Sequence, residues 1–166
     1  MSRRSTVTAR GTPVQHTAIS SGTLVVHGEV FVVQTEQRIE LLDLTDRIVA
    51  LVSRLGVREG LVSLFSLHTT CAVFINETQA ALHADIKRFL EQMVDPDAAW
   101  LHNDPSHSDC DRMNADSLLR ALLLGHSLAL QISGGEIVLG QWQRILMGEL
   151  DGPRARSLRV QVMGTR

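Results

Sequence analysis

The chain has 166 residues, of which 44% are hydrophobic and 20% charged, a balance typical of a globular domain with one buried core. This composition excludes the disordered, collagen-like and low-complexity classes. The net charge of -2 and the 4% aromatic content argue against nucleic-acid partners, which need a basic surplus or base-stacking side chains. No apolar run approaches the roughly 20 residues of a membrane-spanning helix, so we expect no membrane partner.

The two cysteines, Cys71 and Cys110, are too few for a disulfide framework or a four-cysteine zinc site. One bridge and two reduced thiols are the alternatives, and reduced thiols suit a cytoplasmic protein. The first residues are basic but lack the apolar stretch of a secretory signal. We therefore expect a cytoplasmic protein with a flexible tail over residues 1–20 and one domain over residues 21–166.

The first half of the chain predicts strands around one helix. Residues 24–33 are rich in β-branched side chains, which predicts two strands or one bent strand. A helix is expected to start with Thr45 as its N-cap and to end at Gly56. Two buried strands follow, at residues 61–67 and 71–75.

A second helix is predicted to open at Asn76, Glu77 and Thr78 and to bury one apolar face. The residues of that face recur at helical spacing and are Leu82, Ile86, Phe89, Leu90 and Met93. Residues 94–112 then form a long irregular stretch, and loops of that length are commonly functional or mobile.

The last third of the chain predicts one helix and four strands. The helix spans residues 114–124, and the hairpin at residues 128–139 turns on two glycines. Two further strands are expected at residues 143–150 and 158–163. The fold class is therefore α+β, a single compact domain with a mostly antiparallel sheet packed against about three helices.

Polar residues gather at the ends of the two buried strands. His68 and Thr69 follow the first strand, and Asn76 and Glu77 follow the second. One interpretation is a site in which the imidazole of His68 acts as acid, base or ligand and Glu77 orients it. The other is ordinary strand-end polarity, with Asn76 and Glu77 capping a helix.

Two other groups invite a functional interpretation. His102 and His107 lie in the acidic loop, where a divalent cation is one hypothesis and a solvated loop the other. Arg154 and Arg156 follow a Gly-Pro turn and could grip a phosphate, with a solvated turn as the alternative.

An ordered set of short motifs extends over residues 23–164. Its members are Asp43-Leu-Thr45, the run from Ser66 to Glu77, Asp85, Trp100-Leu-His102-Asn103, Asn114, Leu122 to Gly125, Gly135, Leu139 to Gln143, and Glu149 to Arg156. In this order they resemble the YjbQ-like family, whose members are associated with a secondary thiamine-phosphate synthase activity.

The resemblance implies a YjbQ-like α+β fold, a homotrimer and a histidine-centred polar site near a subunit interface. The family pattern after Asn114 has a histidine at the position of Leu118, so two of three family histidines, His68 and His102, remain. On this basis the expected catalytic residues are His68, Thr69, Glu77 and His102. The expected substrate- or phosphate-binding residues are Asn76, Asn114, Gln143, Arg154 and Arg156, and the candidate metal ligands are His68 and His102.

Two functions follow from the resemblance. The first is an enzyme that couples a pyrimidine diphosphate to a thiazole phosphate, with zinc or magnesium as candidate cofactor; a metal-dependent phosphate-ester hydrolase would use the same groups. The second is a non-catalytic trimer that binds a small anionic or phosphorylated ligand, or a protein partner. Leu118 favours the second, because leucine offers neither a metal ligand nor a proton.

Overall fold

A computed structural model describes residues 21–166, so the predicted tail over residues 1–20 lies outside the described residues. Within the described range, the chain forms eight strands, three α-helices and one short 3₁₀-helix. In chain order these are β1 (Leu24–Gln34), β2 (Glu40–Asp43), α1 (Thr45–Leu55), β3 (Glu59–Ser66), β4 (Cys71–Asn76), α2 (Ala80–Met93), η1 (Leu101–Asn103), α3 (Ala115–Leu124), β5 (Ser127–Ser133), β6 (Glu136–Ile137), β7 (Arg144–Glu149) and β8 (Ala155–Thr165).

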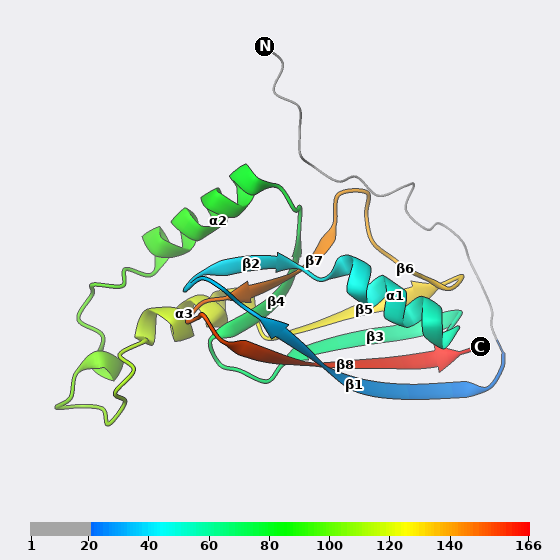
Figure 1. Cartoon of the computed structure of the whole chain (residues 1–166), viewed down its shortest axis with the longest axis horizontal. Coiled ribbons are helices and arrows are strands. Elements are labelled where there is room, and N and C mark those ends of the chain that lie inside the picture. Colours follow the sequence, from blue (N-terminus) through cyan, green and yellow to red (C-terminus); the bar gives the residue numbers. More distant parts are fainter. Residues whose placement is uncertain (1–20) are drawn as a thin grey trace, which may run out of the picture.

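The strands form two sheets with antiparallel pairing throughout the described residues. The larger sheet has the order β1-β8-β3-β5-β6, and the smaller has the order β2-β7-β4. Strands β1 and β8 pair along their whole length and form the long edge of the larger sheet (Figure 1). The predicted α+β class with mostly antiparallel strands is confirmed.

The main core lies between the two sheets and beneath α1. Alternating residues of β8, such as Leu158 and Val160, face Ile48 of α1 and both Ile145 and Met147 of β7. A second, smaller cluster joins the other face of the smaller sheet to α2 and α3. Strand β7 is therefore buried on both faces.

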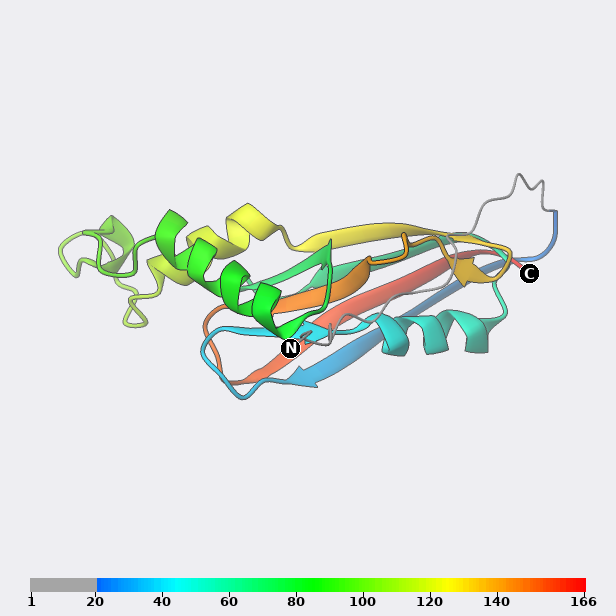
Figure 2. The same ribbon diagram turned by 90° about the horizontal axis from the view of Figure 1, so that it is seen from above.

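Helices α2 and α3 and the segment between them extend beyond one end of the sheets (Figure 2). Arg120 of α3 holds the two helices together, because its guanidinium donates to the backbone carbonyls of Leu90 and Val94 and pairs with Asp116. No helix within residues 21–166 has the length and apolar character needed to span a membrane.

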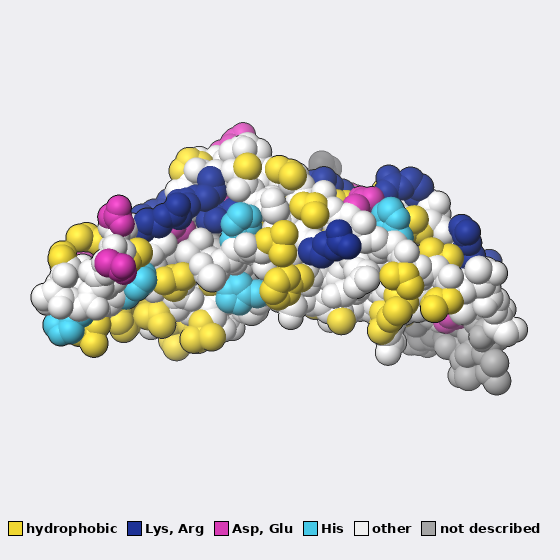
Figure 3. Space-filling view, turned by 90° about the horizontal axis from the view of Figure 1, so that it is seen from below, with side chains coloured by type: hydrophobic (Ala, Val, Ile, Leu, Met, Phe, Trp, Pro, Cys, Tyr) yellow, Lys and Arg dark blue, Asp and Glu magenta, His cyan; other side chains and the backbone are white. Residues whose placement is uncertain are grey.

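The outer face of the larger sheet is exposed and largely apolar. Its large apolar side chains come from β1, β3 and β8 and are Leu24, Val26, Val30, Val32, Leu61, Phe65 and Met163. Figure 3 shows apolar side chains spread along this underside of the molecule, with Lys and Arg side chains between them. We call these seven residues the outer apolar face.

Residues 24–34 form one strand, the second of the two alternatives that the sequence allowed. Two other local predictions need correction. Strand β3 buries only alternate residues, so Leu61 and Phe65 are exposed, as is Leu67 just after it. Thr45 is the first residue of α1 and not its N-cap; the Asp43 carboxylate accepts from the Thr45 N–H instead. Short polar side chains cap helices interchangeably, so the sequence leaves the capping position uncertain by one or two residues.

The second helix also begins later than predicted. Asn76 ends strand β4, and Gln79 is the N-cap of α2, with its side chain accepting from the Leu82 N–H. Of the predicted apolar face, Leu90 is buried while Phe89 and Met93 are exposed. Only a narrow stripe of side chains on α2 is buried against the rest of the protein, because the helix projects past the end of the sheet.

Candidate ligand-binding cavity

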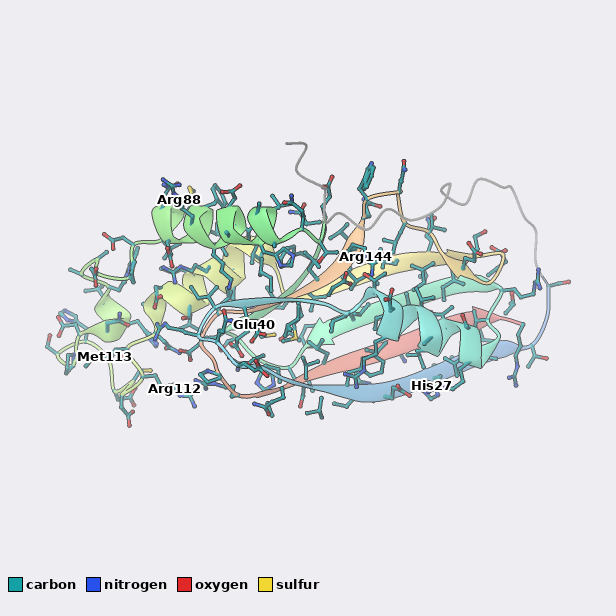
Figure 4. All side chains as sticks on the ribbon, turned by 45° about the horizontal axis from the view of Figure 1, so that its top comes forward. His27, Glu40, Arg88, Arg112, Met113 and Arg144 are labelled. Atoms are coloured by element: carbon teal, nitrogen blue, oxygen red, sulfur yellow. The ribbon has the colours of Figure 1, made fainter. Side chains whose placement is uncertain are left out.

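A cavity of about 610 Å³ opens where the turn after β3 meets the segment before α3 and the start of β8. Its lining combines three arginines and two histidines with apolar side chains, and consists of Leu67, His68, Thr69, Thr70, His102, Cys110, Arg112, Asn114, Leu118, Arg154 and Arg156. Figure 4 shows Arg112 in the segment between α2 and α3, at the part of that segment nearest the ends of the sheets. Six predicted site residues therefore line one cavity: His68, Thr69, His102, Asn114, Arg154 and Arg156.

His68 is held in the turn after β3 by hydrogen bonds on two sides. Its backbone N–H donates to the Ser66 hydroxyl, and its ring Nε2 accepts from the Ser157 backbone N–H at 2.9 Å. Since Nε2 accepts, the neutral ring carries its proton on Nδ1. Burial, and next the Arg156 charge, lower the pKa of His68 below its ordinary value of 6.5. His68 is thus a neutral hydrogen-bond donor at pH 7.

Behind the cavity lies a buried ion pair between Arg156 and Glu149. Both oxygens of the Glu149 carboxylate accept from the Arg156 guanidinium, which also donates to the Thr70 hydroxyl at 3.0 Å. Burial alone would raise the pKa of Glu149, yet hydrogen bonds from Arg156 and from the Asp151 backbone N–H hold it below its ordinary value. The charge of Arg156 is therefore committed to Glu149.

The other two arginines share a single carboxylate. Arg154 donates to Asp151 at 3.2 Å, and Arg112 approaches the same Asp151 oxygen at 3.7 Å. Asn114 also donates to it at 2.9 Å, although as the N-cap of α3 it makes no side-chain cap. One carboxylate opposite two guanidinium groups leaves a surplus positive charge at the cavity wall.

The segment around η1 brings His102 to the cavity. Asn103 accepts from the Ala115 N–H at 3.0 Å and so caps α3 from outside the helix. The Trp100 indole N–H donates to the Asp95 carbonyl at 2.8 Å, which fixes the chain just before η1. The ring Nε2 of His102 is buried, and no described residue is its hydrogen-bond partner.

Three predicted site residues do not line this cavity. Asn76 ends β4 and Glu77 follows it, and the Asn76 side chain accepts from the Glu77 backbone N–H. A strand of six residues separates them from the turn that carries His68, which places them roughly 20 Å away. Gln143 lies in the turn before β7 and accepts from the Gly140 N–H.

A second polar group surrounds Arg144, and all three residues lie at that end of the smaller sheet. Asn76 is the cross-strand partner of Arg144, which pairs with Asp43 at 2.8 Å and with Asp46 at 3.0 Å. Figure 4 shows Arg144 over the sheets, well away from Arg112. The proposed orientation of His68 by Glu77 has no support in this arrangement.

The side chains at the cavity do not form a protein metal site. Catalytic zinc sites use three protein ligands, and no group of three His, Cys, Asp or Glu side chains within residues 21–166 could hold an ion. The unprotonated nitrogen of His68 accepts a hydrogen bond from the Ser157 N–H, and the Leu118 side chain has no atom that can bind a metal. His107 is exposed and bonds to Asp104 and Ser106 in its own loop. The donor set therefore does not fit the implied metal.

Sequence reasoning missed several residues of the site. Glu149 could have been found, because it follows Ile145 and Met147 at the strand period of two and so faces the larger sheet. Arg112 and Cys110 carry no such signal, since they lie in an irregular segment whose path depends on tertiary contacts. Both cysteines are free in the structure, and burial raises the pKa of Cys71.

Comparison with known proteins identifies the family. The profile described as "UPF0047 protein YjbQ-like" matches residues 29–165. A UPF0047 protein of Methanothermobacter thermautotrophicus is 41% identical over 139 residues, covering 84% of this chain and 93% of the relative. The UPF0047 protein YugU of Bacillus subtilis is 28% identical, covering 80% and 96% respectively.

Solved structures agree with this assignment. A YbjQ-like protein of unknown function from Sulfolobus solfataricus superposes with a TM-score of 0.79 at 32% identity, covering 86% of this chain and 99% of that one. A hypothetical protein from Aeropyrum pernix gives a TM-score of 0.76 at 35% identity, covering 83% and 98%. The chain therefore belongs to the YjbQ-like (UPF0047) family.

Proposed function

We propose that the chain binds a small phosphorylated molecule in the cavity formed by His68, Arg112 and Arg154. The observation that carries this proposal is the charge of the wall: three arginines line the cavity and no aspartate or glutamate does. Their carboxylate partners, Glu149 and Asp151, lie behind the wall and number one fewer than the arginines. A phosphate group compensates the remaining positive charge and accepts the guanidinium hydrogen bonds.

The three arginines and His68 have different roles in binding the ligand. Arg112 and Arg154, which are partly exposed, contact the phosphate oxygens directly. The Nδ1–H of His68 donates a further hydrogen bond without adding charge, as its lowered pKa requires. Arg156 acts indirectly, because its ion pair with Glu149 fixes Thr70 at the cavity wall.

The coupling of a pyrimidine diphosphate to a thiazole phosphate is the reaction we propose as a side activity of this site. In it the carbon–oxygen bond to the diphosphate breaks, the thiazole nitrogen forms the new bond to carbon, and pyrophosphate leaves. Arg112 and Arg154 would stabilise the departing pyrophosphate. Leu118 adds no proton donor, so we expect turnover to be slow and ligand binding to be the main activity.

The test is a calorimetric titration with pyrophosphate. We expect saturable binding that weakens about tenfold or more in Arg154→Gln, the loss of one charge-assisted contact. Arg88→Gln, which removes an exposed arginine of α2 away from the cavity, is the matched control and should bind like the unmodified chain. Absence of pyrophosphate binding, or equal loss in both variants, would overturn the proposal. A coupling assay on the same samples measures the side activity.

We also propose that the chain self-associates as a trimer through the outer apolar face. Strands β1 and β8 are 11 residues long, and β3 and β5 are 8 and 7 residues long. At about 3.3 Å per residue and about 4.8 Å between strands, these four strands cover roughly 580 Å². This is about three quarters of the roughly 800 Å² per partner of a standard interface. Light scattering should give three times the chain mass for the unmodified protein and a smaller mass for Val30→Lys. A monomer mass for the unmodified protein would refute self-association.

A further inference from the structure

Helix α3 buries polar side chains and exposes leucines. Its buried polar residues are Asp116, Ser117 and Arg120. The opposite face carries four leucines that are exposed or half-buried, and these are Leu118, Leu119, Leu122 and Leu123. A surface helix ordinarily has the reverse arrangement, with its apolar side chains toward the core. We call these four residues the α3 leucine face.

Hydrogen bonds fix this orientation of the helix. The Arg120 guanidinium donates to the carbonyls of Leu90 and Val94, and the Ser117 hydroxyl donates to the Leu150 carbonyl. Turning the helix to bury its leucines would break these bonds and leave buried carbonyls without partners. The leucines therefore stay in contact with water unless another molecule covers them, and contiguous apolar surface of this kind marks an interaction site.

This surface is also more apolar than the YjbQ-like pattern implies, because Leu118 stands where that pattern has a histidine. Leu118 and Leu119 line an apolar cavity of about 350 Å³, whose lining includes Trp100 and Leu101. Protein interfaces commonly place an apolar side chain of one partner in a pocket of this kind on the other. The α3 leucine face therefore has the shape as well as the composition of a protein-docking surface.

The α3 leucine face adjoins the outer apolar face. Phe65 of that face and His126, which lies two residues beyond α3, line one cavity of about 420 Å³. Figure 3 shows apolar side chains extending from the sheets onto the projecting end of the molecule. Since the two surfaces are continuous and one of them is proposed to bind other copies of the chain, the other favours the same partner.

The area of the outer apolar face points to the same conclusion. Its four strands cover roughly 580 Å², and in a ring of three this area is divided between two neighbours. Each contact then receives less than half of the roughly 800 Å² per partner of a standard interface. Rings are also closed by contacts between two different surfaces of each copy. A trimer therefore needs a second apolar surface, and the α3 leucine face supplies one.

We infer that the α3 leucine face packs against the outer apolar face of a neighbouring copy. This inference rests on the proposed self-association and names the second surface through which the copies meet. Each copy places its leucines on the next copy and receives those of the previous one, which closes the ring.

The first experiment measures molecular mass by light scattering over a dilution series. We expect Leu122→Lys and Leu123→Lys each to raise the concentration at which the assembly dissociates by at least about tenfold, because each places a charge in an apolar contact. Leu122 is 71% exposed and Leu123 is 54% exposed in the single chain, so the fold should be unchanged, which circular dichroism checks.

Phe89→Lys is the matched control. Phe89 is 54% exposed, like Leu123, but it belongs to α2. Figure 1 shows α2 on the side of α3 away from the larger sheet. We expect this variant to assemble like the unmodified chain.

Cross-linking then tests which surfaces meet. Leu122→Cys and Val30→Cys chains, both carrying Cys110→Ser, are treated with a bifunctional maleimide, separately and after mixing. Cys71 is buried and should not react. We expect the mixture to yield linked pairs with one chain of each kind, and the Leu122→Cys sample alone to yield no linked pairs.

A monomer mass for the unmodified chain would refute self-association itself. If the unmodified chain assembles and Val30→Lys lowers its mass, but both leucine variants assemble normally, the outer apolar face stands and this inference is wrong. An absence of mixed pairs, or links between two Leu122→Cys chains, would also overturn it, as would an equal loss of assembly in Phe89→Lys.

Discussion

Arg144 begins strand β7 and Glu149 ends it, so the two polar groups of this molecule lie at opposite ends of one buried strand. At the Glu149 end, the ion pair with Arg156 is sealed from solvent, and its neighbours Arg112 and Arg154 face a cavity. At the Arg144 end, the arginine is nearly buried while its partner Asp46 is 91% exposed. The same residue types thus produce an inward-facing cationic site at one end and an outward-facing acidic surface at the other.

The difference shows that motif residues alone do not define a site. Asn76, Glu77 and Gln143 belong to the same ordered set of motifs as His68 and Arg154, yet they lie at the Arg144 end of β7. There the carboxylates of Asp43 and Asp46 outnumber the arginine and would repel a phosphate. Anion binding is therefore expected at one end of β7 only.

The largest expected effect is the difference in protein stability lost when each of the two ion pairs is broken. Glu149→Gln leaves the guanidinium of Arg156 buried without a counter-charge, which should lower the free energy of unfolding by about 3–5 kcal/mol. Asp46→Asn removes an exposed partner and should cost less than about 1 kcal/mol. Urea unfolding measures both, and similar losses would mean that the two ends do not differ in this way.

Metal binding is the next comparison. Leu118→His adds a nitrogen donor to the cavity that also contains His102, whose Nε2 has no partner among the described residues. We expect zinc affinity, measured by competition with a chelating dye, to rise about tenfold. Leu122→His, on the exposed side of α3, is the control and should change little. Stoichiometric zinc in the unmodified chain would contradict the tautomer assigned to His68.

The protonation state of His68 gives a smaller effect. Because its pKa lies below 6.5, the neutral ring contributes stability that is complete above pH 6.5 and is lost as the pH falls through the lowered pKa. Protonation removes the acceptor of the Ser157 N–H. Between pH 7.5 and pH 5, the unmodified chain should therefore lose about 1 kcal/mol more stability than His68→Gln. Parallel pH profiles would exclude the proposed hydrogen bond.

Glu77→Gln should have the smallest effect. Glu77 lies beyond the far end of β4, at the opposite end of β7 from the cavity. We expect pyrophosphate affinity to change less than about twofold and stability by less than about 0.5 kcal/mol. A large loss of affinity would return Glu77 to the site and would require a second chain to bring it there.

Local patterns in the sequence predicted much of this fold. Gly56 and Gly125 end helices as expected, and the turn at Gly134 and Gly135 joins β5 and β6. The exposure of Phe65 and Phe89 was not predictable, because apolar character does not reveal which face another element covers. The short strand β2 and the helix η1 also carried no periodic signal.

The site was predictable only in part, for a related reason. His68, His102 and Arg154 were singled out as polar residues in unusual settings, and they line one cavity. Arg112 and the apolar cavity at Leu119 depend on how η1 docks on α3, which is a tertiary contact.

A crystal structure of the protein with pyrophosphate would test the central claim most directly. We expect density for the anion between Arg112 and Arg154, within hydrogen-bond distance of His68 Nδ1, and with the Arg156–Glu149 pair unchanged. Anion density at Arg144, or a cationic cavity that holds no anion at saturating pyrophosphate, would contradict it.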